Sequence, residues 1–68
     1  MDKNDRNKLR TMLGYWTEHN REHGMEFKEW ADRMPGTAEA EELLKAVRSM
    51  DEAGESLERA LNIIGKEA

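Results

Sequence analysis

Apolar side chains recur along the chain at alternating intervals of four and three residues, the spacing of a heptad repeat. In the first half the series consists of Leu9, Leu13, Trp16, Asn20, His23, Phe27, Trp30 and Met34, with two polar members. In the second half it consists of Ala40, Leu43, Val47, Met50, Gly54, Leu57, Leu61 and Ile64. This spacing lines up one stripe of side chains along a helix, so each half predicts one long helix that packs against the other.

The only proline of the chain separates the two series. Pro35 disfavours helix in the residue before it, and Gly36 suits the left-handed conformation that often follows a helix end. Thr37 can cap a second helix. The pattern therefore predicts an all-α, antiparallel two-helix hairpin in a single domain, with helices over about residues 4–34 and 38–65 and a turn at 35–37.

Glycines inside the predicted helices affect both stability and register. Gly24 costs the first helix about 1 kcal/mol relative to alanine, so a break is most expected there. Folding the hairpin at Pro35 and Gly36 places Trp16 opposite Gly54, where the missing side chain leaves room for an indole. This match predicts that Trp16, and Trp30 two heptads further on, pack in the core.

The chain is too short and too polar to cover its own apolar stripe. It has 68 residues, 37% of them hydrophobic and 38% charged, and no cysteine that could add a disulfide. Further apolar residues lie beside the two series: Met12, Tyr15, Leu44 and Ile63. Ala46, Ala53 and Ala60 repeat every seven residues, which lets another helix approach closely. A homodimer that forms a four-helix bundle is therefore expected.

Charge and hydropathy restrict the partners and the location of the protein. The net charge is −4, and basic residues are interleaved with acidic ones, which argues against nucleic acid as a partner. No apolar run resembles a signal peptide or approaches the roughly 20 residues of a membrane span. A soluble, cytoplasmic protein without a membrane partner is expected.

The candidate chemistry lies at the middle of the hairpin, where polar residues interrupt the stripe. His19 and His23 are one helical turn apart and can face one object. Asn20 and Asp51 complete a polar layer in the predicted register. Two imidazoles at this spacing can chelate nickel, cobalt or zinc, with Glu22 and Asp51 as candidate oxygen ligands. The sequence predicts a small, non-enzymatic helical module that binds a divalent transition metal.

Two alternatives explain the same residues. In the first, the polar layer is purely structural, or part of a protein-interaction module, and fixes the register and oligomeric state of the bundle, as a buried Asn does in coiled coils. In the second, the segment from His19 to His23 is read as H-x-x-E-H, a zinc-peptidase pattern in which Glu22 activates water. A two-helix hairpin offers no large substrate cleft, so we do not expect an enzyme.

The same segment resembles a small prokaryotic helical-hairpin domain of unknown function. Its pattern, W-x-x-H-N-x-E-H followed by F-x-x-W-A, is matched by residues 16–23 and 27–31. The resemblance covers nearly the whole chain and implies a helical hairpin. It also implies metal binding or metallocentre assembly, because that domain sometimes occurs in the company of nickel- or cobalt-handling proteins. It assigns no catalytic role.

Overall fold

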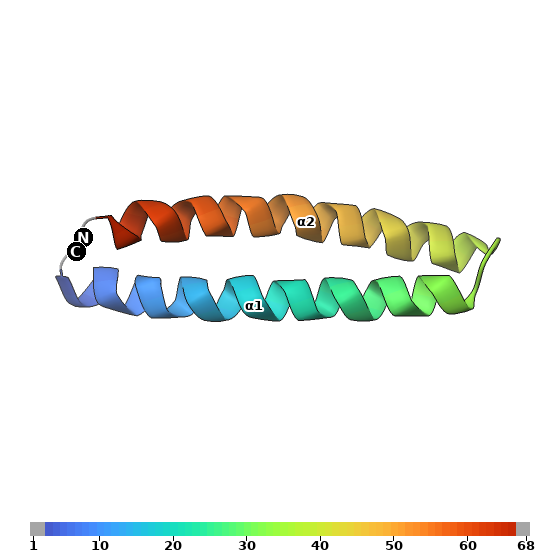
Figure 1. The fold of residues 1–68 in the computed structure, drawn as a ribbon, viewed down its shortest axis with the longest axis horizontal. Coiled ribbons are helices and arrows are strands. Elements are labelled where there is room, and N and C mark those ends of the chain that lie inside the picture. The colour runs from blue at the N-terminus through green and yellow to red at the C-terminus, as the bar shows by residue number, and fades with distance from the viewer. Residues whose placement is uncertain (1–2, 67–68) are drawn as a thin grey trace.

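Two long antiparallel helices make up the structure, a computed structural model that describes residues 3–66 (Figure 1). Helix α1 spans Lys3–Arg33 and helix α2 spans Ala38–Gly65, and they lie side by side along their whole length. The molecule measures 49 × 15 × 14 Å. The predicted all-α helical hairpin is confirmed, and α1 runs through Gly24 without a break. Over the described residues, neither helix has the long apolar stretch that crossing a membrane requires.

Gly36 and Thr37 shape the turn between the helices. Gly36 has a φ of 78°, in the left-handed region that favours glycine. Thr37 caps α2: its Oγ1 accepts a hydrogen bond from the Ala40 backbone N–H at 3.1 Å. The same hydroxyl donates to the Met34 carbonyl at 2.7 Å, which links the end of α1 to the start of α2.

Alanine substitutions at two glycines are expected to change stability in opposite directions. Gly36→Ala should lower the free energy of unfolding by about 1–2 kcal/mol, because an alanine strains at positive φ. Gly14→Ala should raise it by up to about 1 kcal/mol, because Gly14 is helical and a methyl group there meets open space. Urea denaturation followed by circular dichroism measures both. Equal effects of the same sign would contradict this account of the turn.

The packing stripe of α1 differs from the predicted one. Leu13, Gly24 and Ala31 are buried against α2, whereas Trp16 and Trp30 keep 41% and 54% of their surface exposed. The prediction that both tryptophans pack in the core of the hairpin is therefore wrong. Ala31, only 4% exposed, packs where an indole would be too large. At Gly24 a methyl group would still meet open space.

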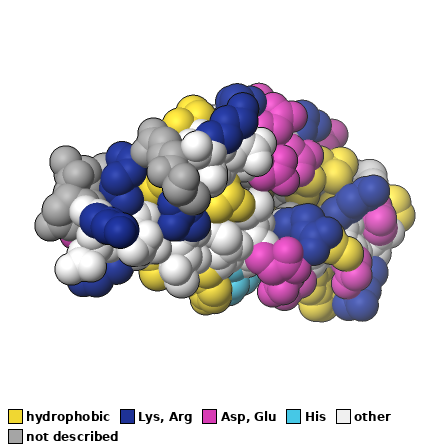
Figure 2. Space-filling view, turned by 60° about the vertical axis from the view of Figure 1, so that its left-hand side comes forward, with side chains coloured by type: hydrophobic (Ala, Val, Ile, Leu, Met, Phe, Trp, Pro, Cys, Tyr) yellow, Lys and Arg dark blue, Asp and Glu magenta, His cyan; other side chains and the backbone are white. Residues whose placement is uncertain are grey.

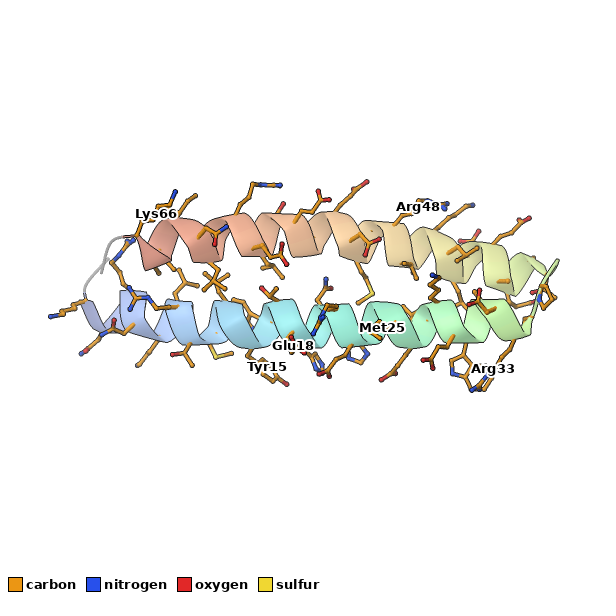
Figure 3. The ribbon with its side chains drawn as sticks, viewed as in Figure 1. Tyr15, Glu18, Met25, Arg33, Arg48 and Lys66 are labelled. Carbon is orange, nitrogen blue, oxygen red and sulfur yellow. The ribbon has the colours of Figure 1, made fainter. Side chains whose placement is uncertain are left out.

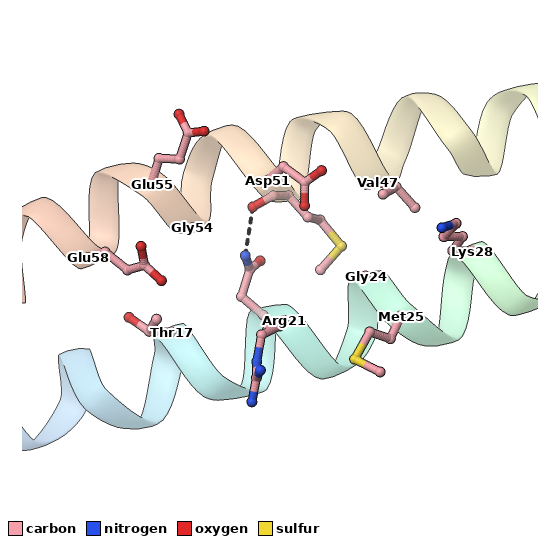
Figure 4. A pocket seen from close by; sticks show the side chains of 12 residues that line it. Thr17, Arg21, Gly24, Met25, Lys28, Val47, Asp51, Gly54, Glu55 and Glu58 are labelled. Carbon is pink, nitrogen blue, oxygen red and sulfur yellow. Dashed lines mark hydrogen bonds between the residues drawn. The ribbon is translucent and has the colours of Figure 1, made fainter.

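Asn20, and not Trp16, lies against Gly54. A methyl group added to Gly54 would come within 3.2 Å of the Asn20 Nδ2 atom. That amide donates a hydrogen bond of 2.7 Å to the backbone carbonyl of Met50 (dashed line in Figure 4). The polar partner of Asn20 is thus a main-chain atom rather than Asp51. This bond crosses from one helix to the other near their middle, so it fixes the register of the hairpin.

Candidate metal site

His19 and His23 meet on the surface of α1. Their Nε2 atoms are 2.9 Å apart, and their rings stand edge to face with centroids 4.3 Å apart. His19 is exposed and His23 half-buried. Figure 2 shows histidine atoms at the surface beside hydrophobic ones. The helix therefore presents two imidazole nitrogens side by side and accessible to solvent.

Two aromatic residues continue the histidine pair along the same helix. Tyr15 stacks on His19 at a centroid distance of 5.3 Å, and the ring of Phe27 lies 6.0 Å from that of His23. All four rings follow each other at intervals of four residues, so they form a continuous row. These contacts limit rotation of the imidazoles, a role that sequence analysis missed for Tyr15 and Phe27. The four-residue spacing visible in the sequence could have indicated it.

The distance between the two nitrogens matches the bite of a chelating pair. If a metal bound both Nε2 atoms at about 2.0–2.1 Å, their 2.9 Å separation would give an N–metal–N angle of about 90°. That angle belongs to octahedral or square-planar coordination, and a tetrahedral zinc site needs a wider one. A hydrogen bond at 2.9 Å needs one ring with its proton on Nε2, so for both Nε2 atoms to bind a metal that ring would carry its proton on Nδ1 instead.

The two candidate carboxylate ligands lie in different places. Glu22 is exposed on α1, three residues after His19. Asp51 lines a groove on the opposite flank of the hairpin, together with Arg21. Within residues 3–66, no three histidine or carboxylate groups come together in a way that could hold a metal. The single hairpin thus brings together the two histidines and leaves Asp51 apart from them.

The groove that contains Asp51 is lined by charges of both signs. It has a volume of about 430 Å³ and runs between the helices, with Arg21 and Lys28 on α1 and Asp51 and Glu58 on α2 (Figure 4). The Arg21 guanidinium donates hydrogen bonds of 2.8 and 3.0 Å to the carboxylate of Glu18, which raises the pKa of Arg21. The guanidinium therefore stays positively charged, and the groove is a solvated, mixed-charge surface.

Comparison with known proteins identifies a family without assigning an activity. Residues 9–64, which include the histidine pair and most of both helices, match the model of a family described as a domain of unknown function, DUF8180. Comparisons with curated proteins and with solved structures found no match. The matched part of the chain is far more than half of it, and the chain therefore belongs to the DUF8180 family of domains of unknown function.

Proposed function

We propose that this protein is a small, non-enzymatic helical module of the cytoplasm that binds a divalent transition metal through His19 and His23. The observation that carries the proposal is the pair of Nε2 atoms, 2.9 Å apart on an accessible face of α1. Neutral imidazole is the commonest metal ligand among side chains, and two of them at i and i+4 chelate one ion. Glu22, three residues after His19 on the same helix, is the candidate oxygen ligand.

The chelate angle favours some metals over others. Nickel and cobalt in the divalent state accept nitrogen ligands at about 90°, whereas zinc prefers tetrahedral sites. We therefore propose nickel or cobalt before zinc. An accessory role in metal handling, such as holding an ion for transfer, suits a site that is exposed and formed by few ligands.

A structural or protein-interaction module is the alternative function. It is favoured by the exposed aromatic side chains of α1, among them Tyr15 at 58% exposure and Trp30 at 54%. In that case the histidines only continue an apolar surface that a protein partner covers. Asn20 already holds the register of the hairpin through Met50, so the histidines are not needed for it.

Calorimetric titration of the chelator-stripped protein with Ni²⁺, Co²⁺ and Zn²⁺ tests the proposal. We expect binding of Ni²⁺ and Co²⁺ at micromolar or lower concentration, with the weak visible absorption of octahedral Co²⁺. Shifts of the imidazole proton signals in NMR spectra should accompany the binding. Absence of heat and of shifts up to millimolar metal would reject the metal function and favour the interaction module.

A further inference from the structure

The two long flanks of the hairpin differ in character. By helix geometry, one flank carries two rows of α1 side chains, and successive members of a row are seven residues apart. One row includes Leu9, Trp16, His23 and Trp30, and the other includes Met12 and His19. We call this flank the aromatic flank. Between residues 46 and 60, the side chains of α2 on this flank are small, those of Ala46, Ser49, Ala53, Ser56 and Ala60. Ile63, which is 63% exposed, continues the row of Ser49 and Ser56 towards the end of α2. The opposite flank is the one with the charged groove.

The aromatic flank exposes several large apolar side chains. Trp16 and Trp30 are 41% and 54% exposed, Met12 is 40% exposed, and Tyr15 at the edge of the flank is 58% exposed. The three aromatic side chains alone leave roughly 300 Å² uncovered, which is already the size of the largest patch on a typical monomer. Within residues 3–66 the buried hydrophobic side chains are only Leu13, Ala31, Ala40 and Ile64.

We propose that a second copy of this chain covers the aromatic flank, antiparallel to the first, and that the two histidine pairs then share one metal ion. The two-fold axis crosses the hairpin at Ala53 of α2 and close to His19 of α1. The metal part rests on the proposed function, and the dimer does not. A partner copy is specified by three features of the flank: the alanine spacing, the shape of the α1 surface and the charges at its ends.

The alanine spacing places the axis on α2. In an antiparallel pair of α2 helices centred on Ala53, each Ala46 lies opposite Ala60 of the partner subunit, so small residues meet small residues along two turns on either side. Small side chains at such contacts let helix axes come close. Asn20 of α1 lies opposite the helical turn of α2 that runs from Met50 to Gly54. His19 is therefore the residue of α1 that lies at the same height along the hairpin as Ala53.

The same axis matches large and charged side chains of α1 to complementary ones. When the two-fold axis passes α1 at His19, Trp30 of one subunit lies within about one helical turn of Leu9 and Met12 of the partner subunit. At the ends, Arg33 lies level with Asp5 of the partner subunit. Arg33 points away from α2 (Figure 3), and its guanidinium lies over the ring of Trp30, 4.7 Å from the centroid. One rotation therefore pairs apolar surface at Trp30 and opposite charges at Arg33, and each of these pairings occurs twice in the dimer.

The dimer would also complete the metal site. A hairpin supplies two nitrogens at about 90°, which leaves most positions of an octahedral or square-planar ion open. The two-fold axis brings His19 and His23 of the partner subunit to within about one turn of the first pair. Four imidazoles at one centre fill a square plane. The ion is then held between the subunits, and the stoichiometry is one metal per two chains.

Single cysteines test the arrangement, because the chain has none of its own. With oxidation, Ala53→Cys should form a disulfide-linked dimer rapidly, since the two copies meet at the axis. Ala46→Cys alone and Ala60→Cys alone should not, because equivalent residues lie about 21 Å apart along the helices. A mixture of Ala46→Cys and Ala60→Cys should crosslink. Met25→Cys, exposed on the charged flank, is the matched control and should stay uncrosslinked.

Each other outcome overturns a defined part of the proposal. If Ala53→Cys crosslinks no faster than Met25→Cys, the dimer is wrong; if Ala46→Cys and Ala60→Cys each crosslink alone, the helices are not antiparallel. Sedimentation equilibrium in chelator and calorimetry with Ni²⁺ separate the metal from the dimer. One ion per chain in an intact dimer overturns the shared site and leaves the proposed function standing. A crosslinked dimer that binds none of Ni²⁺, Co²⁺ and Zn²⁺ overturns the proposed function and the shared site together.

Discussion

The His19→Ala and His23→Ala variants are each expected to lose roughly 100-fold or more in affinity for Ni²⁺ or Co²⁺. Loss of a residue that only orients a metal ligand already costs 10–100-fold, and here one of two chelating nitrogens disappears. The remaining imidazole would hold the ion as a single weak ligand. His19 is exposed and His23 only half-buried, so the helical circular dichroism of the protein without metal should hardly change. Calorimetry on each variant gives the affinity.

A second pair of exposed residues on α1, also four apart, provides the matched control. The Arg21→Ala/Met25→Ala variant changes the other flank of the helix and should bind metal as the parent protein does. Glu22→Gln tests the oxygen ligand separately and should cost less than either histidine, because it leaves the chelate intact. If the control weakens binding as much as the histidine variants, the ion binds somewhere other than at this pair.

Leu13→Ala is expected to lower the free energy of unfolding by about 3 kcal/mol. Leu13 is only 3% exposed and fills the space between the helices, so its truncation leaves a cavity that two rigid helices close poorly. Few other side chains contribute buried apolar area, because the remaining buried hydrophobic residues in residues 3–66 are Ile64 and two alanines. A loss of this size is a large part of the stability of so small a domain. Thermal unfolding followed by circular dichroism should show a much lower midpoint.

Leu44→Ala is the control for this loss. Leu44 keeps 38% of its surface exposed on α2 and should cost about 1 kcal/mol or less, since water already reaches it. Similar losses for the two variants would mean that the stability does not reside in the buried contact between the helices. Chemical denaturation at two protein concentrations separates the stability of the hairpin from that of an association between copies.

The helices and their antiparallel order follow from local chemistry. The spacing of apolar residues requires two amphipathic helices, and Pro35, Gly36 and Thr37 provide the only strong turn between them. The four-residue interval between His19 and His23 likewise places their side chains next to each other, because residues so spaced lie on one face of any α-helix. None of these features depends on a distant residue. The hairpin and the histidine pair are therefore specified by neighbouring residues alone.

The side of α1 that faces α2 was decided only by tertiary packing. Leu13, Asn20 and Phe27 belong to two overlapping heptad series, one continued by the tryptophans and His23 and the other by Gly24 and Ala31. Hydrophobicity alone favours the first series. The second series is the one buried against α2, and its small members leave the bulky indoles of the first series beside the contact rather than inside it. The tryptophans and histidines are therefore left on one flank, and Asp51 on the other.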